Sequence, residues 1–292
     1  MAPNLELHHL SADPADEWQR MLRFAALVET DYSAMARTVE VLMQRSTELV
    51  VNTYDYLSTV PETAAILGWE QSVDEAHLEE RRRFFTIWLA RTLGLDQSSD
   101  FAYYLFRAGK FHAGQGPRRI HTQPAYVSVS VGMVLASFSN YMLEEGLPSD
   151  VIAPAMAGWS KYLSVQLNQM LMGYQVAQEF ISGDFPVHLS FYARLREIIG
   201  QAECEVNMDH GSNLEALLTK FFNYFPQART ESLDPLWRSE ERANSAWVEV
   251  SQVYLPRRGW RVLLNGRDVS HENGFEVTIN KDDNIAIFPP GR

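Results

Sequence analysis

The sequence predicts a chain of two domains, an all-α domain over residues 1–182 and a small α+β domain over residues 187–292. Up to about residue 180, apolar residues recur at spacings of three and four, which is typical of amphipathic helices. Beyond the segment "SGDFP", short runs alternate apolar and polar residues on both sides of a single helix, as half-buried strands do. Strands before and after one helix favour an α+β fold, and 292 residues suffice for two domains of ordinary size.

Six helices account for the first domain, and several have a recognisable start or end. We expect them over residues 14–27, 31–60, 72–94, 100–114, 124–146 and 149–180. Asp31 is a good cap for the second helix, and Ser72, followed three residues later by Glu75, matches a capping box for the third. Gly94 is expected to end the third helix, and Pro124 is tolerated in the first turn of the fifth.

The second domain has short segments of strand character around one helix. We expect strands within residues 186–195, within residues 260–269 around an Asn-Gly turn, and within residues 284–290. The helix covers residues 212–225, with Ser212 as its expected cap and Glu215 three residues later. Residues 226–258 are charged, contain scattered tryptophans and fit neither pattern, so we expect an insertion there.

Composition argues against several classes of protein. The net charge of −12 argues against nucleic-acid binding, which usually needs a basic face. The single cysteine, Cys204, excludes an internal disulfide and a cysteine-based zinc site, and it fits a reducing cytoplasm. No apolar run approaches the roughly 20 residues of a membrane helix, and the acidic, polar N-terminal segment is unlike a secretory signal. We therefore expect a cytoplasmic protein that binds neither nucleic acid nor a membrane.

Three groups of residues in the first domain follow the order and spacing of a known family. They are Tyr54 and Leu57 with Pro61-Glu62-Thr63, then Gly109 and His112 in a Gly-x-x-His pattern, and then, after Gly114 or Gly116, Pro124-Ala125-Tyr126. In these features residues 18–180 resemble the globin domains of protoglobins and globin-coupled sensors. The resemblance implies an all-α globin fold that holds haem b, whose iron binds a diatomic gas.

Two histidines compete for the position of iron ligand that the resemblance implies. His112 lies at the end of the expected helix 100–114, where the family places its ligand, and a helix can hold a neutral imidazole toward the metal. His121 lies in the following loop, three residues before Pro124. This loop is several residues longer than the family pattern leads us to expect, so a shifted alignment would favour His121. If the domain has lost its haem, neither histidine binds anything.

The resemblance also implies residues that contact the haem. Tyr54 is the candidate donor of a hydrogen bond to the gas ligand, or else it is a tyrosine packed between helices. The other candidates are residues that could equally be ordinary core: Phe85, Trp88, Leu89, Phe111, Tyr126, Ser130 and Met133. The run Arg81-Arg82-Arg83 is expected to be a solvated face, with a role at the haem propionates as the alternative.

The second domain also carries motifs of a known family, in order. They are "LREIIG" after the first strand, the helix over residues 212–225, "VLLNGRDV", and "DDNIAIFPP". Residues 187–292, without the insertion at 226–258, thereby resemble the ThiS/MoaD sulfur carriers, which have a ubiquitin-like β-grasp fold. Those carriers act through a terminal Gly-Gly, whereas this sequence reads Pro290-Gly291-Arg292. We therefore expect the domain to contact a protein partner and not to carry sulfur.

Our first hypothesis is a haem protein that binds dioxygen or another diatomic gas, with the β-grasp domain as an interaction module. The alternatives are a sulfur-carrier protein of molybdopterin or thiamin type regulated by a globin domain, and a haem-free signalling scaffold. We recognise no catalytic residues, so an enzyme is the less favoured class. The resemblance further implies a homodimer through the helices at 124–146 and 149–180, which are apolar over more of their circumference than one core face needs.

Overall fold

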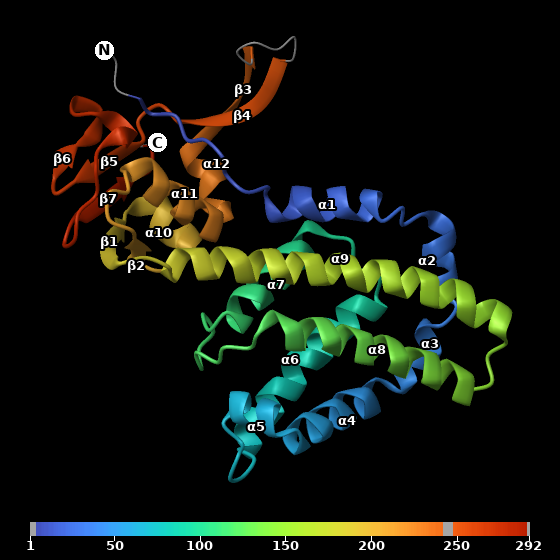
Figure 1. Ribbon diagram of the computed structural model, residues 1–292. Helices are drawn as coiled ribbons and strands as arrows, with labels where there is room; N and C mark the ends of the chain where they lie inside the picture. Colours follow the sequence, from blue (N-terminus) through green and yellow to red (C-terminus); the bar gives the residue numbers. More distant parts are fainter. Residues whose placement is uncertain (1–3, 242–247, 291–292) are drawn as a thin grey trace. The chain divides into compact units, whose positions relative to one another are not determined.

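The computed structural model describes residues 4–241 and 248–290, and the chain divides into two compact units (Figure 1). The helical unit is Pro14–Gln175, and the sheet unit is Met1–Asp13 together with Val176–Arg292. The N-terminal segment therefore belongs with the C-terminal half, whereas the sequence suggested an extension of the helical domain. The cause is backbone pairing, because the amide and carbonyl of Leu7 both bond to Tyr254 and the Leu7 side chain is fully buried.

Nine helices form the helical unit within the described residues. They are α1 (Pro14–Phe24), α2 (Glu29–Ala36), α3 (Val39–Gln44), α4 (Ser46–Thr59), α5 (Pro61–Leu67), α6 (Glu75–Leu93), α7 (Ser99–His112), α8 (Pro124–Glu144) and α9 (Ser149–Ile181), the last of which continues into the sheet unit. The largest buried side chains include Trp18, Phe101 and Tyr162. Trp18 packs edge-on against both rings, with ring centroids 5.8 and 6.0 Å apart, so α1, α7 and α9 share one core.

The helix expected over residues 31–60 is three helices, α2, α3 and α4, and α5 follows as a separate short helix. The first break lies at Thr38, whose hydroxyl donates to the carbonyl of Met35 and accepts from the indole of Trp159 at 3.0 Å. A threonine that bonds locally to the backbone competes with helical hydrogen bonds. Here the distant Trp159 favours that competing arrangement, so the sequence pattern alone could not place the break.

Both helix caps expected in the helical unit are wrong. Asp31 lies inside α2, where its carboxylate accepts a hydrogen bond from the amide of Val28 at 3.1 Å. Helix α6 begins three residues after Ser72, because Asp74 is the N-cap and accepts from the amide of His77. By contrast, Gly94 ends α6 and Pro124 opens α8, as predicted.

Helix α8 is long and apolar enough to cross a membrane, and it is the one such helix in the described part of the chain. This differs from the expectation that no apolar run has that length. The feature is weak evidence for a membrane span, because helices of soluble proteins also meet these two criteria.

A five-stranded mixed sheet forms the sheet unit, with strand order β2-β1-β7-β5-β6. The strands are β1 (Phe185–Phe191), β2 (Glu203–Met208), β5 (Arg261–Leu264), β6 (Arg267–Asp268) and β7 (Asn284–Phe288), accompanied by helices α10 (Ala193–Ile199) and α11 (Leu214–Tyr224). β1 pairs in parallel with β7, and the other neighbours are antiparallel. Leu217, Leu218 and Phe221 of α11 are fully buried, so this helix contributes much of the core.

Local sequence explains some of these boundaries and not others. The strand predicted within residues 186–195 ends at Phe191, and Ala193–Ile199 is helical. Asn213, and not Ser212, caps α11 by accepting from the amide of Ala216 at 2.9 Å. The Asn265-Gly266 turn between β5 and β6 is present, with φ of 48° and 82°, the positive values that this turn type requires.

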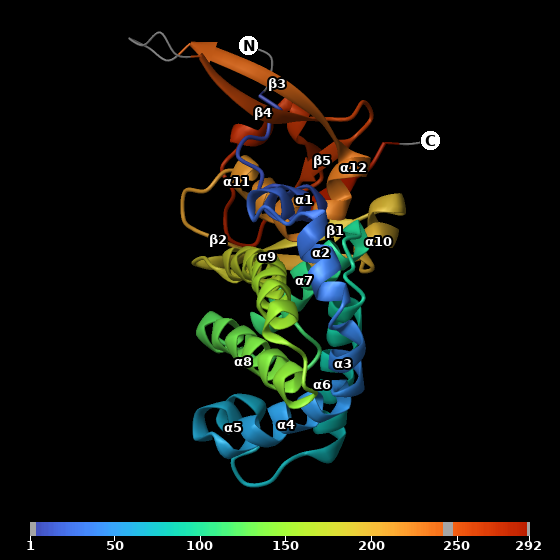
Figure 2. The ribbon, with the colours of Figure 1, turned by 90° about the vertical axis from the view of Figure 1, so that its right-hand side faces the viewer.

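The segment expected as an insertion contains a β-hairpin. Two short helical turns, Pro226–Ala228 and α12 (Arg229–Ser232), precede strands β3 (Leu233–Glu241) and β4 (Val248–Pro256), which pair with each other as a separate two-stranded sheet (Figure 2). Arg229 anchors this segment, since its guanidinium donates to the carbonyls of Phe222 and Ser11.

Candidate functional site

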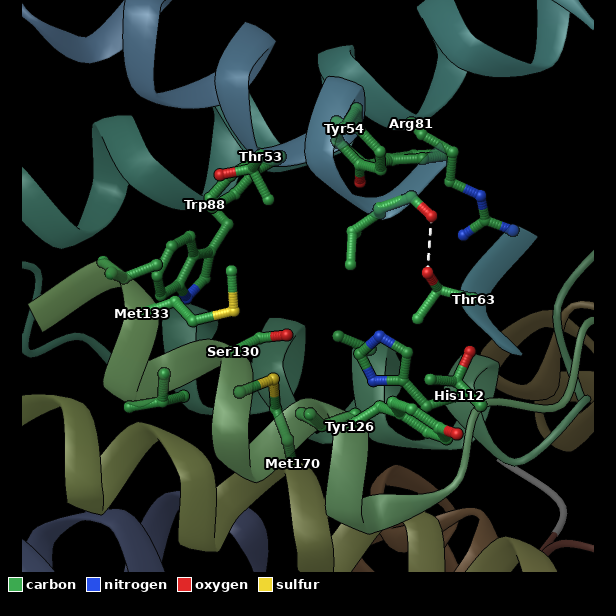
Figure 3. A pocket seen from close by; sticks show the side chains of 18 of the residues that line it. Thr53, Tyr54, Thr63, Arg81, Trp88, His112, Tyr126, Ser130, Met133 and Met170 are labelled. Carbon is green, nitrogen blue, oxygen red and sulfur yellow. Dashed lines mark hydrogen bonds between the residues drawn. The ribbon is translucent and has the colours of Figure 1, made fainter. Parts of the chain in front are cut away.

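A cavity of about 260 Å³ lies inside the helical unit, among helices α4 to α9 (Figure 3). Its lining is mostly apolar and comprises Thr53, Tyr54, Leu57, Thr63, Ile66, Leu67, Arg81, Phe84, Phe85, Trp88, Tyr104, Ala108, His112, Thr122, Tyr126, Val127, Ser130, Val131, Met133, Val134 and Met170. Arg81 is the one lysine, arginine or acidic residue in this lining. A ligand with a large apolar surface would therefore suit the cavity.

His112 is the last residue of α7, and its ring points into the cavity (Figure 3). Its Nδ1 atom is buried and has no hydrogen-bond partner among the described residues. Burial, and to a lesser extent the positive charge of Arg81, lowers the pKa of His112 to about 4. The imidazole is thus neutral near pH 7, which is the form that binds metals.

Two glycines bring helix α7 into backbone contact with α9. A methyl group at Gly109 would lie 1.9 Å from the carbonyl oxygen of Met170, and one at Gly173 would lie 1.9 Å from that of Phe106. The end of α7 is held as well, because the carbonyl of His112 accepts from the amide of Thr122 at 2.8 Å. These contacts fix the position of His112 at the cavity wall.

His121, the alternative ligand, lies outside the cavity lining. It is exposed, and its Nε2 atom is 2.7 Å from the hydroxyl of Tyr174 on α9. Its backbone forms an isolated bridge with Ala113. The geometry therefore gives His121 a partner at the protein surface and leaves the cavity to His112.

Aromatic side chains form the wall opposite His112. Tyr54 meets Phe85 edge-to-face at 6.1 Å between ring centroids, and Phe85 stacks on Trp88 at 5.3 Å. The indole of Trp88 donates to the side-chain oxygen of Gln166 at 2.8 Å, which fixes its orientation. Burial raises the pKa of Tyr54 to about 12, so its hydroxyl stays protonated and can donate a hydrogen bond.

The cavity brings together most of the candidates from the sequence: Tyr54, Phe85, Trp88, His112, Tyr126, Ser130 and Met133. Leu89 and Phe111 are not part of its lining. Each adjoins a lining residue in a helix, Trp88 or His112, and successive helical residues point about 100° apart. Leu89 is instead buried in the core, and Phe111 packs against Gly116.

Several lining residues escaped the sequence analysis. Tyr104 and Ala108 lie eight and four residues before His112 on α7, so helical spacing alone could have found them. Arg81 stood out in the sequence, but as part of a run expected to face solvent. Ile66, Leu67 and Met170 carry no local signal, because α5 and α9 reach the cavity through tertiary packing.

The residues of the cavity fit haem b. A neutral imidazole with a buried nitrogen that lacks a hydrogen bond, His112, faces a space between aromatic and aliphatic walls. Among the described residues, no group of three or more histidine, cysteine or acidic side chains is arranged to hold a metal ion.

Comparison with known proteins gave matches to both halves of the chain. Residues 15–180 match the family described as Protoglobin, and residues 189–291 match the ThiS family. Together they show a globin architecture followed by a β-grasp architecture, which confirms the predicted fold class. No match was found among curated proteins.

Solved structures resemble each half separately. The globin domain of a Geobacter sulfurreducens globin-coupled sensor is 19% identical, with 54% of this chain and 97% of that chain covered and a TM-score of 0.43. The small archaeal modifier protein 1 of Methanosarcina acetivorans is 21% identical, with 36% of this chain and 93% of that chain covered and a TM-score of 0.27. The protein of the same name from H. volcanii is 16% identical, with 37% of this chain and 100% of that chain covered and a TM-score of 0.28.

Proposed function

The chain belongs to the protoglobin family, and from that premise we propose that it is a haem protein that binds dioxygen or another diatomic gas. The observation that carries the proposal is His112, a half-buried neutral imidazole whose buried Nδ1 lacks a hydrogen bond among the described residues, at the wall of an apolar cavity. Haem b, when bound, supplies an iron atom with a position for a gas molecule.

The side chains of the cavity would have different roles toward the haem and its gas ligand. His112 would hold the iron from the end of α7, whose position is set by the close backbone contact with α9. Tyr54, on the opposite wall, offers a protonated hydroxyl as a hydrogen-bond donor to a gas ligand. Phe85 packs against Tyr54, and Trp88 packs against Phe85, so the space next to Tyr54 would be apolar.

The absorption spectrum of the purified full chain tests this proposal. We expect an intense Soret band that shifts when carbon monoxide is added to the reduced protein, with about one haem per chain. Protein that shows no Soret band, even after incubation with haem, would instead support the haem-free scaffold.

We further propose a homodimer through α8 and α9. Helix α8 exposes small and apolar residues at spacings of three and four, Ala125, Val129, Gly132 and Ala136, and the same face continues through the polar Asn140 to Leu143. Only 22% of an apolar 18-residue stretch of α8 is buried within one chain. Helix α9 likewise exposes Ala153, Ala157 and Ser160. Small residues allow two helices to approach closely, and a two-fold pairing would cover both faces.

For the sheet unit we propose a role as a protein-interaction module, in line with its ThiS match. The same match supports a second candidate, a sulfur carrier. Intact mass decides between them after incubation with a carrier-activating enzyme, ATP and a sulfur donor. An unchanged mass supports the interaction module, and an exchange of one oxygen for sulfur supports the carrier.

A further inference from the structure

The cavity has a charged side chain at one side only. Arg81 of α6 lies next to Thr63 there, while Trp88 and Met133 lie on the other side (Figure 3). Arg81 is half-buried, so its charge is partly removed from water. A half-buried cation on an apolar wall needs a compensating group.

No carboxylate of the described residues forms an ion pair with Arg81, although its charge, after the hydrogen bond from Arg118, also contributes to lowering the pKa of Glu80. Its neighbour Arg82 pairs with Asp55 at 3.0 Å, and Arg118 pairs with Glu80 at 2.6 Å. Arg81 makes no ion pair in the described part of the chain. Its one side-chain hydrogen bond there runs from Nε to the Nε2 atom of His77, at 2.9 Å.

His77 cannot satisfy Arg81 and its other neighbour at once. The indole of Trp69 approaches Nδ1 of His77 at 3.2 Å, and Arg81 approaches Nε2, yet both neighbours are donors. Burial, with the charges of Arg81 and Arg118, lowers the pKa of His77, so the ring is neutral and has one acceptor nitrogen. Trp69 is 4% exposed and has a single donor, whereas a guanidinium has five N–H groups. The one acceptor nitrogen of His77 therefore accepts from the indole of Trp69 and not from Arg81.

We infer that Arg81 binds a carboxylate at this side of the cavity, namely a carboxylate of the haem whose binding was proposed above. The inference rests on that proposed function. Haem b is an apolar plate with two carboxylates on one edge, and the cavity is an apolar space with one guanidinium at one side. A guanidinium matches a carboxylate in two parallel hydrogen bonds, so Arg81 would both retain the haem and select how it enters.

The test compares haem b with its dimethyl ester, in which both carboxylates are masked. Each is loaded into the full-length wild type and into Arg81→Leu, Arg81→Lys and Arg82→Leu, and its rate of loss to an excess of apomyoglobin is followed in the Soret region. Arg82→Leu is the matched control, since it removes the same charge from the adjacent residue. Circular dichroism confirms that each variant is folded.

We expect the wild type and Arg82→Leu to lose the ester at least about tenfold faster than haem, the range of a hydrogen bond to a charged group. Arg81→Leu should lose ester and haem at similar rates. Arg81→Lys keeps the charge but not the paired geometry, so its ratio of the two rates should lie between those of the wild type and Arg81→Leu. If the ratio of the ester loss rate to the haem loss rate in Arg81→Leu equals that of the wild type, the inference is overturned. The proposal of gas binding would still stand.

A second arm separates the haem carboxylate from a free anion as the partner of Arg81. Azide is titrated into the ferric forms of the wild type and Arg81→Leu. Similar azide affinities support the haem carboxylate. Weaker azide binding in Arg81→Leu, with an unchanged ester-to-haem ratio, would overturn it. A wild type that takes up neither haem nor ester would refute the proposed function itself.

Discussion

Replacing Gly109 with alanine should destabilise the helical unit by about 2 kcal/mol. The added methyl group would lie 1.9 Å from the carbonyl oxygen of Met170 and 2.9 Å from the amide nitrogen of Tyr174, distances that real Cβ atoms essentially never show. Both neighbours are backbone atoms of α9, so no rotamer change relieves the clash and the helices must separate by about 1 Å. Overpacking typically costs about 1–3 kcal/mol, and a clash with backbone atoms falls at the upper end, about 3 kcal/mol, of which the better helix propensity of alanine offsets about 1 kcal/mol.

Thermal unfolding followed by circular dichroism at 222 nm measures this effect. A loss of about 2 kcal/mol corresponds to a fall in Tm of roughly 4–8 °C for a unit of this size. Because Gly109 is three residues before His112, the variant should also lose haem faster. Arg107→Ala, an exposed change on the same helix, should stay within about 0.5 kcal/mol of the wild type. A Gly109→Ala protein as stable as this control would refute the close approach of α7 and α9.

Three further changes have defined outcomes. Tyr54→Phe should speed the release of dioxygen by about tenfold in stopped-flow measurements, since it removes one hydrogen bond, and unchanged release would mean that the phenol points elsewhere. Val129→Glu, at a side chain 66% exposed in one chain, should yield the 33.3 kDa monomer in sedimentation, whereas a monomeric wild type would contradict the dimer. The hydrogen bond from Lys161 lowers the pKa of Asp31, so its stabilising effect is present above pH 3.8 and is lost as pH falls further. Asp31→Asn should flatten this acid dependence of Tm, and an unaltered slope would count against the pair.

The sequence predicted those parts of the fold that depend on neighbouring residues. Pro124 marks the start of α8 because its fixed backbone geometry suits a first helical turn. Gly94 ends α6 as predicted, but with a right-handed φ of −72°, and the left-handed residue at this end is Leu95, with a φ of 52°.

Ser72 and Ser212 were chosen as caps wrongly, because an equally suitable residue follows each: Asp74 two positions after Ser72, and Asn213 one position after Ser212. Asp31 was also wrong as a cap, because α2 begins before it. Residue type alone cannot decide between neighbouring residues that have equal preference for the N-cap position.

Contacts between distant segments account for what the sequence could not predict. The break at Thr38 depends on Trp159, and the placement of the N-terminal segment depends on the pairing of Leu7 with Tyr254. In the cavity, helical spacing and the family motif led to His112 and Tyr54. Arg81 was expected to face solvent because its two neighbours are also arginines, and only the fold distinguishes it from them.

Haem content of two histidine variants tests the central claim most directly. His112→Ala and His121→Ala are purified beside the wild type, saturated with haem, passed through a desalting column and measured by Soret absorbance per chain. The account predicts about one haem per chain in the wild type and in His121→Ala, and little or none in His112→Ala, with the helical circular dichroism of all three alike. Loss of haem from His121→Ala together with full retention by His112→Ala would contradict it.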